Sequence, residues 1–408
     1  MNAGEVRLRV GMSELDRVLG GGLVAGSLTL LGGDPGVGKS TLLLMVLAHF
    51  AARGVPVLYV SGEESARQVR LRAERLGIAD ERLYLLPVTR LESAIEAAEQ
   101  LGPAVVVIDS VQTLASESLE SVPGSVSQVR EVAAKAMALA KGRDVATFLV
   151  GHVTKQGGIA GPKVLEHLVD TVLYFEGDGR SPLRILRATK NRFGATGELG
   201  FFEMAGDGLR EVPDASARLL RERVAGAPGT AVVAALEGTR PVLAEVQALV
   251  GRPSAGTPGR TALGLDRGRL GMLMAVLGKM GVLLHDRDVF ISAAGGLRIT
   301  EPAADLGVAM ALASSLLDRP VDPSLLVFGE VGLVGEVRAV AHPGPRLLEA
   351  ARHGFRRVVA PKAAVRDSPE GLEVIGVSSL IEAVEVAMRT NPLAVGDGEG
   401  YGAASSGR

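Results

Sequence analysis

The chain has 408 residues, a formal net charge of −2 and no cysteine, with 47% apolar and 22% charged residues. This length allows two domains with sizeable cores, and the absence of cysteine excludes disulfides and thiolate metal sites, so we expect no zinc. The charge balance excludes a generally basic, nucleic-acid-coating surface but not a local basic channel. No signal core begins the chain and no apolar run approaches the roughly 20 residues of a membrane span. We therefore expect a soluble, cytoplasmic protein without membrane contact.

One stretch, residues 33–41, carries most of the functional information. It reads G-D-P-G-V-G-K-S-T and fits the phosphate-binding pattern G-x-x-x-x-G-K-[ST] at every fixed position. An expected strand at 27–31 precedes it and an expected helix at 41–50 follows, so glycine-loop N–H groups and a helix N-terminus can face one phosphate. We expect Lys39 to reach the β- and γ-phosphates and Ser40 to hold Mg²⁺. The predicted nucleotide-binding residues are Gly33, Asp34, Pro35, Gly36, Val37, Gly38, Lys39, Ser40 and Thr41.

Acidic residues end two other expected strands. The run 104–108 is wholly apolar and ends in Asp109, which is typical of the carboxylate on the Mg²⁺ side of a nucleotide site. The strand at 55–60 is followed by Glu63 and Glu64. Because ligands bind at the carboxyl ends of parallel strands, one of the two glutamates could polarise the attacking water, and we favour Glu63. The alternative is that both acids only favour a helix N-terminus.

A histidine and a basic loop follow the next expected strand, at 146–150. His152 lies at the strand end, where it could sense the γ-phosphate or serve only a structural role. The loop 154–163 contains Lys155 and Lys163. Lysines and backbone N–H groups can follow nucleic-acid phosphates, so the loop is a candidate DNA contact, with an ordinary surface loop as the alternative.

Two cations end a pair of strands expected at 170–177 and 183–189. Lys190 and Arg192 occupy alternate positions of an extended segment and therefore project to the same side. They could meet the phosphates of this chain's nucleotide or of a neighbour's. Spacing alone favours the alternative, a solvated hairpin.

The pattern divides the chain into an α/β nucleotide domain at 1–215, a linker at 216–228 with prolines and charges, a second domain at 229–390, and a Gly- and Ser-rich tail at 391–408 that we expect to be disordered. In the first domain we also expect helices at 66–76, 91–101 and 126–140, a strand at 83–86, and a loop at 110–124. In the second domain we expect helices at 270–284, 303–317, 347–352 and 380–388, and strands at 289–291, 358–360 and 374–377.

Together with the phosphate loop, the runs 59–65 (Y-V-S-G-E-E-S) and 107–110 (V-I-D-S) resemble a RecA-type ATPase core. The run 190–194 (K-N-R-F-G) matches the signature of the bacterial RadA (Sms) DNA-repair family. Four runs of the second half resemble that family's C-terminal domain, which is similar to the Lon protease domain: E-G-T-R-P at 237–241, D-V-F at 288–290, E-P-A-A-D at 301–305 and F-G-E-V-G at 328–332. The resemblance covers residues 10–388. It implies an α/β, RecA-like P-loop ATPase domain, with a mainly parallel sheet and flanking helices, followed by an α+β Lon-protease-like (S5-type) domain.

The resemblance further implies a homohexameric ring similar to DnaB-type helicases, in which DNA-dependent ATP hydrolysis drives branch migration during homologous recombination and DNA repair. It assigns ATP and Mg²⁺ to Lys39, Ser40 and Asp109, and the catalytic base to Glu63. It has Lys190 and Arg192 acting in trans on the neighbour's nucleotide or coupling it to DNA, and the loop from Lys155 to Lys163 touching single-stranded DNA. The implied partners are single-stranded and branched DNA, further copies of the chain, and the recombinase RecA.

Two departures limit what can be carried over. The family normally begins with a four-cysteine zinc finger, and this chain has no cysteine. Relative to Lon, Ala303 occupies the position of the serine nucleophile, and no lysine lies between Lys279 and Lys362. Because nucleophilic hydrolysis needs both nucleophile and base, we expect no peptidase activity, and a domain that builds the ring and offers Lys279, Arg267 and Arg269 to duplex DNA.

Two other functions share the same ATP site. One is a KaiC-like ATPase or switch in which the glutamates act on protein partners rather than DNA. The other is an ATP-dependent protease, which the absent serine and lysine argue against. Residues 190–194 and the lysine loop favour the DNA motor.

Overall fold

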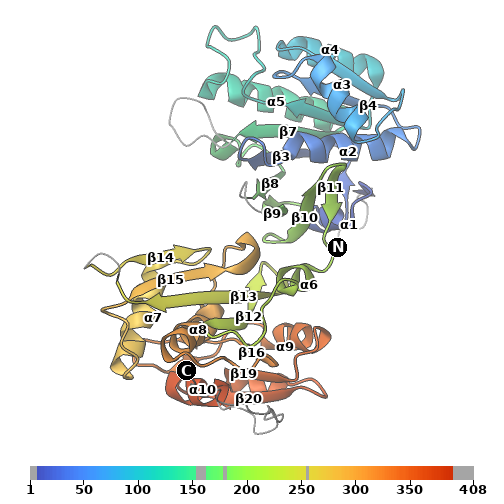
Figure 1. Cartoon of the computed structure of the whole chain (residues 1–408). Coiled ribbons are helices and arrows are strands. Elements are labelled where there is room, and N and C mark those ends of the chain that lie inside the picture. Colours follow the sequence, from blue (N-terminus) through green and yellow to red (C-terminus); the bar gives the residue numbers. More distant parts are fainter. Residues whose placement is uncertain (1–6, 153–161, 178–181, 254–256, 389–408) are drawn as a thin grey trace, which may run out of the picture. The chain divides into compact units, whose positions relative to one another are not determined.

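The computed structural model describes residues 7–152, 162–177, 182–253 and 257–388. The chain divides into two compact units, Met1–Arg218 with Leu236–Arg240, and Leu219–Ala235 with Pro241–Arg408. We refer to them as unit 1 and unit 2 (Figure 1). Helix α6 (Ala215–Leu220) occupies the start of the stretch where the sequence predicts a linker, so residues 216–228 are not free of regular structure. The predicted tail, 391–408, lies outside the described residues.

Unit 1 is built on one nine-stranded sheet in the order β11-β10-β9-β8-β3-β7-β6-β4-β5. The strands from β8 to β5 in this order run parallel, and β9, β10 and β11 extend the sheet antiparallel. Strands β3, β4 and β6 are buried along their whole length, as expected for continuous apolar runs in a parallel sheet. The nine strands of the sheet are β3 (Leu28–Gly33), β4 (Val57–Ser61), β5 (Leu83–Pro87), β6 (Val105–Asp109), β7 (Ala146–His152), β8 (Thr171–Glu176), β9 (Leu183–Asn191), β10 (Leu199–Ala205) and β11 (Gly208–Glu211). The short pair β1 (Arg7–Leu8) and β2 (Leu23–Val24) forms a separate ribbon.

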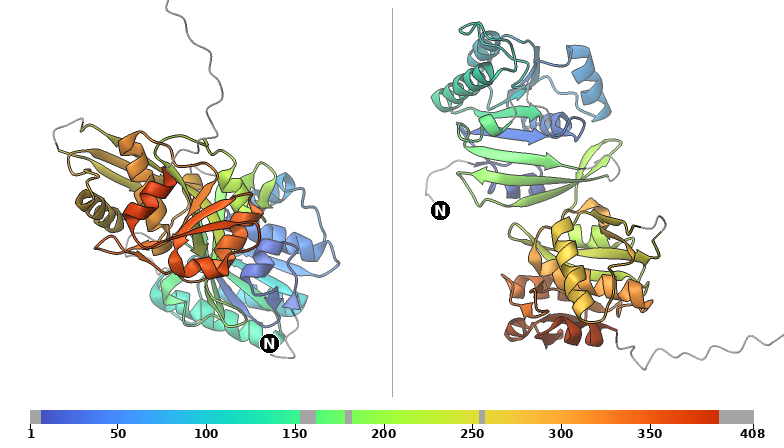
Figure 2. Two further views of the ribbon diagram at one scale, coloured as in Figure 1. Left: turned by 90° about the horizontal axis from the view of Figure 1, so that it is seen from below. Right: turned by 90° about the vertical axis from the view of Figure 1, so that its left-hand side faces the viewer.

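Helices cover both faces of this sheet, as Figure 2 shows from two further sides. One apolar core lies under α1 (Ser13–Val18), α2 (Lys39–Ala51) and α3 (Ala66–Arg75), and a second lies under α4 (Leu91–Leu101) and α5 (Val126–Arg143). Helix α5 is 18 residues long. Even so, none of the helices in the described ranges combines the length and apolar content needed to cross a bilayer.

The parallel strands bring their carboxyl ends to one edge of the sheet. In register, Gly33 at the end of β3 lies beside His152 of β7, and Ser61 at the end of β4 lies beside Asp109 of β6. Strands β3, β7, β6 and β4 are adjacent in the sheet in this order. The residues that the sequence analysis singled out at the ends of these four strands are therefore neighbours. This is the edge at which open α/β sheets bind ligands.

The segment 110–124, predicted to be a loop, contains no helix or strand but is held against α5. The side-chain amide nitrogen of Gln128 donates to the backbone carbonyls of Ser116, Leu119 and Ser121 at 3.2, 3.1 and 2.9 Å. The amide oxygen of Gln128 accepts from the N–H of Ser116 at 2.9 Å. One buried side chain thus satisfies several backbone groups of the loop, which begins directly after Asp109.

Unit 2 contains a seven-stranded mixed sheet in the order β14-β15-β13-β12-β16-β19-β20. Helix α8 packs on one face, where a Cβ at Gly307 would lie 2.1 Å from Val233, and α9 packs on the other through Leu347 and Ala350. The bounds are β12 (Thr230–Glu237), β13 (Arg240–Gly251), β14 (Arg260–Leu263), β15 (Asp288–Ala293), β16 (Leu325–Val327), β19 (Arg357–Pro361) and β20 (Glu373–Val377), with the small pair β17 (Glu330–Val331) and β18 (Val337–Arg338) and helices α7 (Arg267–Lys279), α8 (Asp305–Leu317), α9 (Pro343–Arg352) and α10 (Leu380–Ala387).

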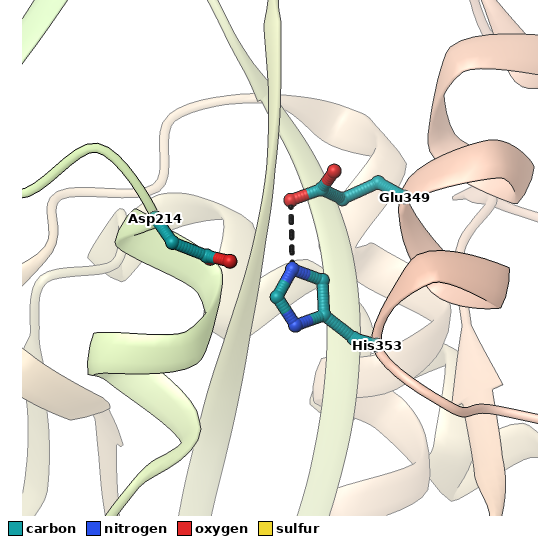
Figure 3. A group of neighbouring side chains, drawn as sticks. All are labelled: Asp214, Glu349 and His353. Carbon is teal, nitrogen blue, oxygen red and sulfur yellow. Dashed lines mark hydrogen bonds and ion pairs between the residues drawn. The ribbon is translucent and has the colours of Figure 1, made fainter.

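Helix α9 is attached to unit 2 by polar as well as apolar contacts. Arg346 is fully buried, forms a two-pronged ion pair with Glu301, and donates to the carbonyl of Ala234 at 2.6 Å. A further contact lies at the C-terminal end of α9 itself: the ring nitrogen Nε2 of His353, one turn after Glu349, lies 3.2 Å from Glu349 Oε1 (Figure 3). Because breaking a buried ion pair leaves an uncompensated charge, Arg346 is a structural residue of this fold.

Four strands of the unit 2 sheet, β12, β13, β14 and β16, are not among those predicted from the sequence. The pattern of β13 is interrupted by Glu245 and Gln247, yet Glu245 is only 2% exposed and its pKa is raised by burial. Strand β16 has three residues, too few to show a period. The predicted helix at 270–284 is displaced to α7, which starts at Arg267 behind the capping residue Asp266.

Candidate active site

The phosphate loop joins β3 to α2 at the carboxyl edge of the unit 1 sheet. Gly38 is the N-cap of α2 and has a φ of 115°, which favours glycine. A Cβ at Gly33 would lie 2.4 Å from the carbonyl oxygen of Phe175, so this position also requires glycine. The other predicted loop residues are exposed (Asp34, Pro35, Gly36), half-buried (Ser40, Thr41) or buried (Val37).

Lys39 is held inside the loop. It is 3% exposed, and its Nζ donates to the carbonyls of Gly33 and Asp34 at 2.9 and 3.0 Å. The same nitrogen lies 3.1 Å from Nδ1 of His152. Burial lowers the pKa of Lys39. Nearby carboxylates oppose this effect, and Asp109 contributes most to the opposition. The carbonyls of Gly33 and Asp34 are neutral acceptors, so a charged phosphate oxygen can displace them from the Lys39 ammonium.

Asp109 collects two hydroxyl donors on one oxygen. Ser40 Oγ donates to Asp109 Oδ2 at 2.6 Å, and the Tyr59 hydroxyl donates to the same oxygen at 2.5 Å. Tyr59 is fully buried on the neighbouring strand β4, and burial together with Asp109 raises its pKa, so it remains a donor. The structure thus brings Ser40 and Asp109 together, and their oxygens are the kind of ligands that Mg²⁺ prefers.

Glu63 faces the same centre from the end of β4. Its Oε1 accepts from Ser110 Oγ at 2.5 Å and lies 3.1 Å from Nε2 of His152, an ion-pair distance without hydrogen-bond alignment. Contact with His152 and the Ser110 hydroxyl, together with the charge of Lys39, lowers the pKa of Glu63 against the effect of its burial. His152 therefore stands between the loop lysine and Glu63, and it contacts both.

The neighbouring glutamate is engaged elsewhere. Both carboxylate oxygens of Glu64 accept from the guanidinium of Arg72 on α3, each at 2.6 Å. The N–H of Glu64 donates to Ser61 Oγ at 3.1 Å. Both oxygens of Glu64 are therefore occupied by a bidentate ion pair. This difference in hydrogen bonding makes Glu63, and not Glu64, the candidate catalytic base.

Lys190 and Arg192 do not join this centre. Lys190 Nζ donates to the carbonyls of Glu166 and Val169 at 2.7 and 2.8 Å, and burial followed by the charge of Arg192 lowers its pKa. Arg192 Nη1 lies 3.1 Å from the buried carboxylate of Asp170, while its own side chain is 55% exposed. Within their own chain both cations therefore have structural partners.

Strand register places these two cations away from the phosphate loop of their own chain. Phe175 of β8 lies beside Gly33 at the loop, whereas Val172 of the same strand lies beside Lys190. Three residues along a strand correspond to about 10 Å, and Arg192 lies further still in that direction. Through β8, Lys190 is level with Leu30 in β3 and Arg192 with the start of that strand, whereas the phosphate loop follows its end.

The predicted DNA-binding lysines are only partly visible. Lys163 is exposed in the short helix η1 (Pro162–Val164), and Lys155 lies outside the described residues. Of the candidate duplex contacts, Lys279 and Arg267 are exposed, whereas Arg269 pairs with the buried carboxylate of Asp305.

Several residues of the site carry no sequence signal of their own. Gln112 exchanges hydrogen bonds with the backbone of His152, at 3.2 Å to its carbonyl and 3.4 Å from its N–H. Arg184, 8% exposed on β9, donates from Nε to the carbonyl of Val37 in the phosphate loop at 3.2 Å. Like Tyr59, these side chains form hydrogen bonds with motif residues that are distant in the chain. Their role at the site can therefore be recognised only once the order of the strands is known.

Comparisons with known proteins bear on the fold class and on the family of the chain. The family model of AAA domains matches residues 6–158, and that of the Lon protease (S16) C-terminal proteolytic domain matches residues 278–389. Among solved structures, a KaiC-like protein of Pyrococcus horikoshii superposes with a TM-score of 0.43 at 22% identity, over 52% of this chain and 100% of its own. The two family matches confirm the predicted fold class, and the AAA domain implies ATP binding and hydrolysis.

Curated relatives match nearly the whole chain. DNA repair protein RadA of Bacillus subtilis is 50% identical over 387 residues, covering 94% of this chain and 84% of its own. The proteins of the same name from Halalkalibacterium halodurans and Pseudomonas aeruginosa are 51% and 52% identical, covering 94% and 93% of this chain and 85% and 84% of their own. The chain therefore belongs to the RadA family of DNA repair proteins, with an ATP-binding AAA domain followed by a Lon-type C-terminal domain.

Proposed function

We propose that this protein is a DNA-dependent ATPase that assembles as a hexameric ring, binds single-stranded DNA and drives branch migration of recombination intermediates. The observation that carries the proposal is the separation of two groups of charged residues. Lys39 and Glu63 lie at the carboxyl ends of the parallel strands, and Lys190 and the half-exposed Arg192 lie toward the opposite ends. Head-to-tail contacts between identical subunits form a ring when the rotation from one subunit to the next closes. Such contacts would place Arg192 of one subunit at the nucleotide of the next.

The residues of one chain suit the binding of ATP and Mg²⁺ and the activation of the attacking water. Lys39 binds the γ-phosphate, and Glu63 orients the attacking water and accepts its proton. The lowered pKa of Glu63 means that its carboxylate is ionised at neutral pH and has an oxygen free to accept a proton. Ser40 and Asp109 would hold Mg²⁺, which neutralises phosphate charge when bound. Arg192 from the neighbour would stabilise the charge that develops on the transferred phosphoryl group, the role of an arginine finger.

The coupling to DNA would run through His152. Its ring contacts Lys39 and Glu63, its backbone is held by Gln112, and Lys155 follows three residues later in the chain. An arriving γ-phosphate competes for the Lys39 ammonium and so alters the contact that His152 makes. We assign the binding of single-stranded DNA to Lys155 and Lys163, with Lys190 and Arg192 linking DNA to the neighbour's nucleotide.

Single-stranded DNA is expected to stimulate ATP hydrolysis by the assembled protein, and its binding is expected to weaken with salt. Lysine–phosphate contacts release counterions, which gives a slope of about 0.7 in log K per contact on a log salt axis. Replacing Lys155 and Lys163 by alanine should lower the slope by about 1.4 if each makes one contact. The measurement is fluorescence anisotropy of a labelled oligonucleotide across a salt series, together with the hydrolysis rate.

Lys362→Ala, an exposed lysine of unit 2, is the matched control and should leave the slope unchanged. An assembled protein that hydrolyses ATP without any response to DNA would contradict the motor and favour the KaiC-like switch acting on protein partners. A salt-independent affinity would instead remove the lysine loop as the main contact. Movement of a labelled Holliday junction with ATP then tests branch migration itself.

Tyr59→Phe is expected to raise the Mg²⁺ concentration needed for half-maximal hydrolysis by about 3- to 10-fold, because a hydrogen bond to a charged group contributes about 1.5–3 kcal/mol and Ser40 retains part of the orientation. The rate at saturating Mg²⁺ should change little. The measurement is a Mg²⁺ titration at fixed ATP. Tyr84→Phe, on the edge strand β5 and 44% exposed, serves as the control. An unchanged Mg²⁺ dependence would show that Tyr59 does not position Asp109.

A further inference from the structure

Unit 2 contains a cavity of about 190 Å³ between the first turns of α7 and α8 and strand β15. Its floor is made of aliphatic side chains, none more than 5% exposed. Protein interiors leave few voids larger than a water molecule, and an apolar cavity of about 150 Å³ takes up small hydrophobic ligands rather than water. The floor residues are Leu270, Leu273, Ile291, Ile299 and Val308.

The charged groups around the cavity are of two kinds. Those inside are neutralised within the fold, because Arg269 donates to Asp305 Oδ1 at 2.8 Å, and Glu301 is held by the buried Arg346. At the rim, Asp266 is exposed and uses Oδ1 to cap α7, accepting from the N–H of Arg269 at 2.7 Å. In the described part of the chain, no hydrogen bond or ion pair engages Asp266 Oδ2.

We propose that this cavity is a binding site for an extended protein segment that places one bulky aliphatic side chain on the apolar floor and an adjacent lysine or arginine against Asp266. The volume suits a single aliphatic side chain, and the carboxylate at the rim suits a cation. Nucleic acid fits less well, since the exposed carboxylate of Asp266 repels phosphates and the aliphatic floor offers no hydrogen bonds. This site is independent of the proposed ATPase motor, and unit 2 would thus recruit a protein partner without cleaving it.

The proposal is tested by saturation-transfer NMR on the full chain with three capped dipeptides. N-acetyl-Leu-Lys-amide is expected to receive saturation at its leucine methyls. N-acetyl-Leu-Glu-amide should bind about 3- to 10-fold more weakly, because its carboxylate meets Asp266. N-acetyl-Ser-Lys-amide should show no transfer, because a hydroxyl on the apolar floor has no partner.

Two kinds of variant separate the floor from the rim. Asp266→Asn keeps a good helix cap and removes the charge, so it should bind the lysine and glutamate peptides equally. Leu265→Trp, at the half-buried rim, and Val308→Phe, on the floor, should occupy the cavity and abolish transfer. Thermal melting and ATP hydrolysis, both expected near wild-type values for Leu265→Trp, check that each variant folds.

Three results would overturn the proposal. The first is the absence of transfer to N-acetyl-Leu-Lys-amide at millimolar concentration. The second is transfer in folded Leu265→Trp protein that equals the transfer in wild type. The third is a preference for the lysine peptide over the glutamate peptide that persists in Asp266→Asn. None of them depends on DNA or ATP. A failure here leaves the ATPase motor standing, and a failure of DNA stimulation leaves this site standing.

Discussion

Glu63→Gln is expected to slow ATP hydrolysis by about 10²- to 10⁴-fold, the usual contribution of a general base, while ATP still binds. The amide retains the size of the side chain and can still accept from Ser110 Oγ, which is 2.5 Å away, but it cannot take a proton from water. The loop lysine and its contacts with the phosphates are unaffected. The measurements are steady-state hydrolysis in the assembled protein and binding of a fluorescent ATP analogue.

Glu64→Gln is the matched control, because it makes the same chemical change one residue along the chain. Glu64 is occupied by Arg72 through two hydrogen bonds of 2.6 Å, so its loss removes a half-buried ion pair and no catalytic group. Hydrolysis should stay within about three-fold of wild type. If Glu64→Gln were the inactive variant and Glu63→Gln the active one, the assignment from geometry would be wrong.

Lys39→Ala and Arg192→Ala are each expected to reduce hydrolysis by at least about 10²-fold, as expected for loss of one preorganised group that stabilises transition-state charge. Mixed in equal amounts, they should recover about a quarter of wild-type activity if sites form between subunits. A site at an interface is complete when one subunit supplies an intact phosphate loop and its neighbour supplies Arg192. The measurement is hydrolysis across mixing ratios, after subunit exchange has been verified.

The double variant carrying both substitutions is the control, because it cannot complete a site in any neighbour and should give no recovery with either single variant. Thermal melting of Arg192→Ala is needed alongside, since Arg192 contacts the buried carboxylate of Asp170 at 3.1 Å and its loss could weaken the fold. A folded Arg192→Ala protein with wild-type activity, or mixed assemblies without recovery, would show that Arg192 serves only its own chain.

Most elements of unit 1 could be predicted because their patterns are strong. Strand β6 is a continuous apolar run that ends in Asp109, and α3 begins at Ala66 behind the N-cap residue Ser65, which forms a capping box with Gln68. Unit 2 was harder to predict. Strand β13 carries the buried Glu245, and such a residue interrupts the alternation by which a half-buried strand is recognised.

The amino-acid sequence by itself determined the phosphate loop, Asp109 and the family of this protein, because a glycine loop between strand and helix is a local feature and strand ends in parallel sheets share one edge. The tertiary structure decided which side chains act on that centre. In the folded chain Glu64 pairs with Arg72, whereas Glu63 contacts His152. Tyr59 donates to Asp109 because β4 pairs with β6. The physical reason is that charge pairing and hydrogen bonding depend on strand order, and neighbours in the sheet are not neighbours in the chain.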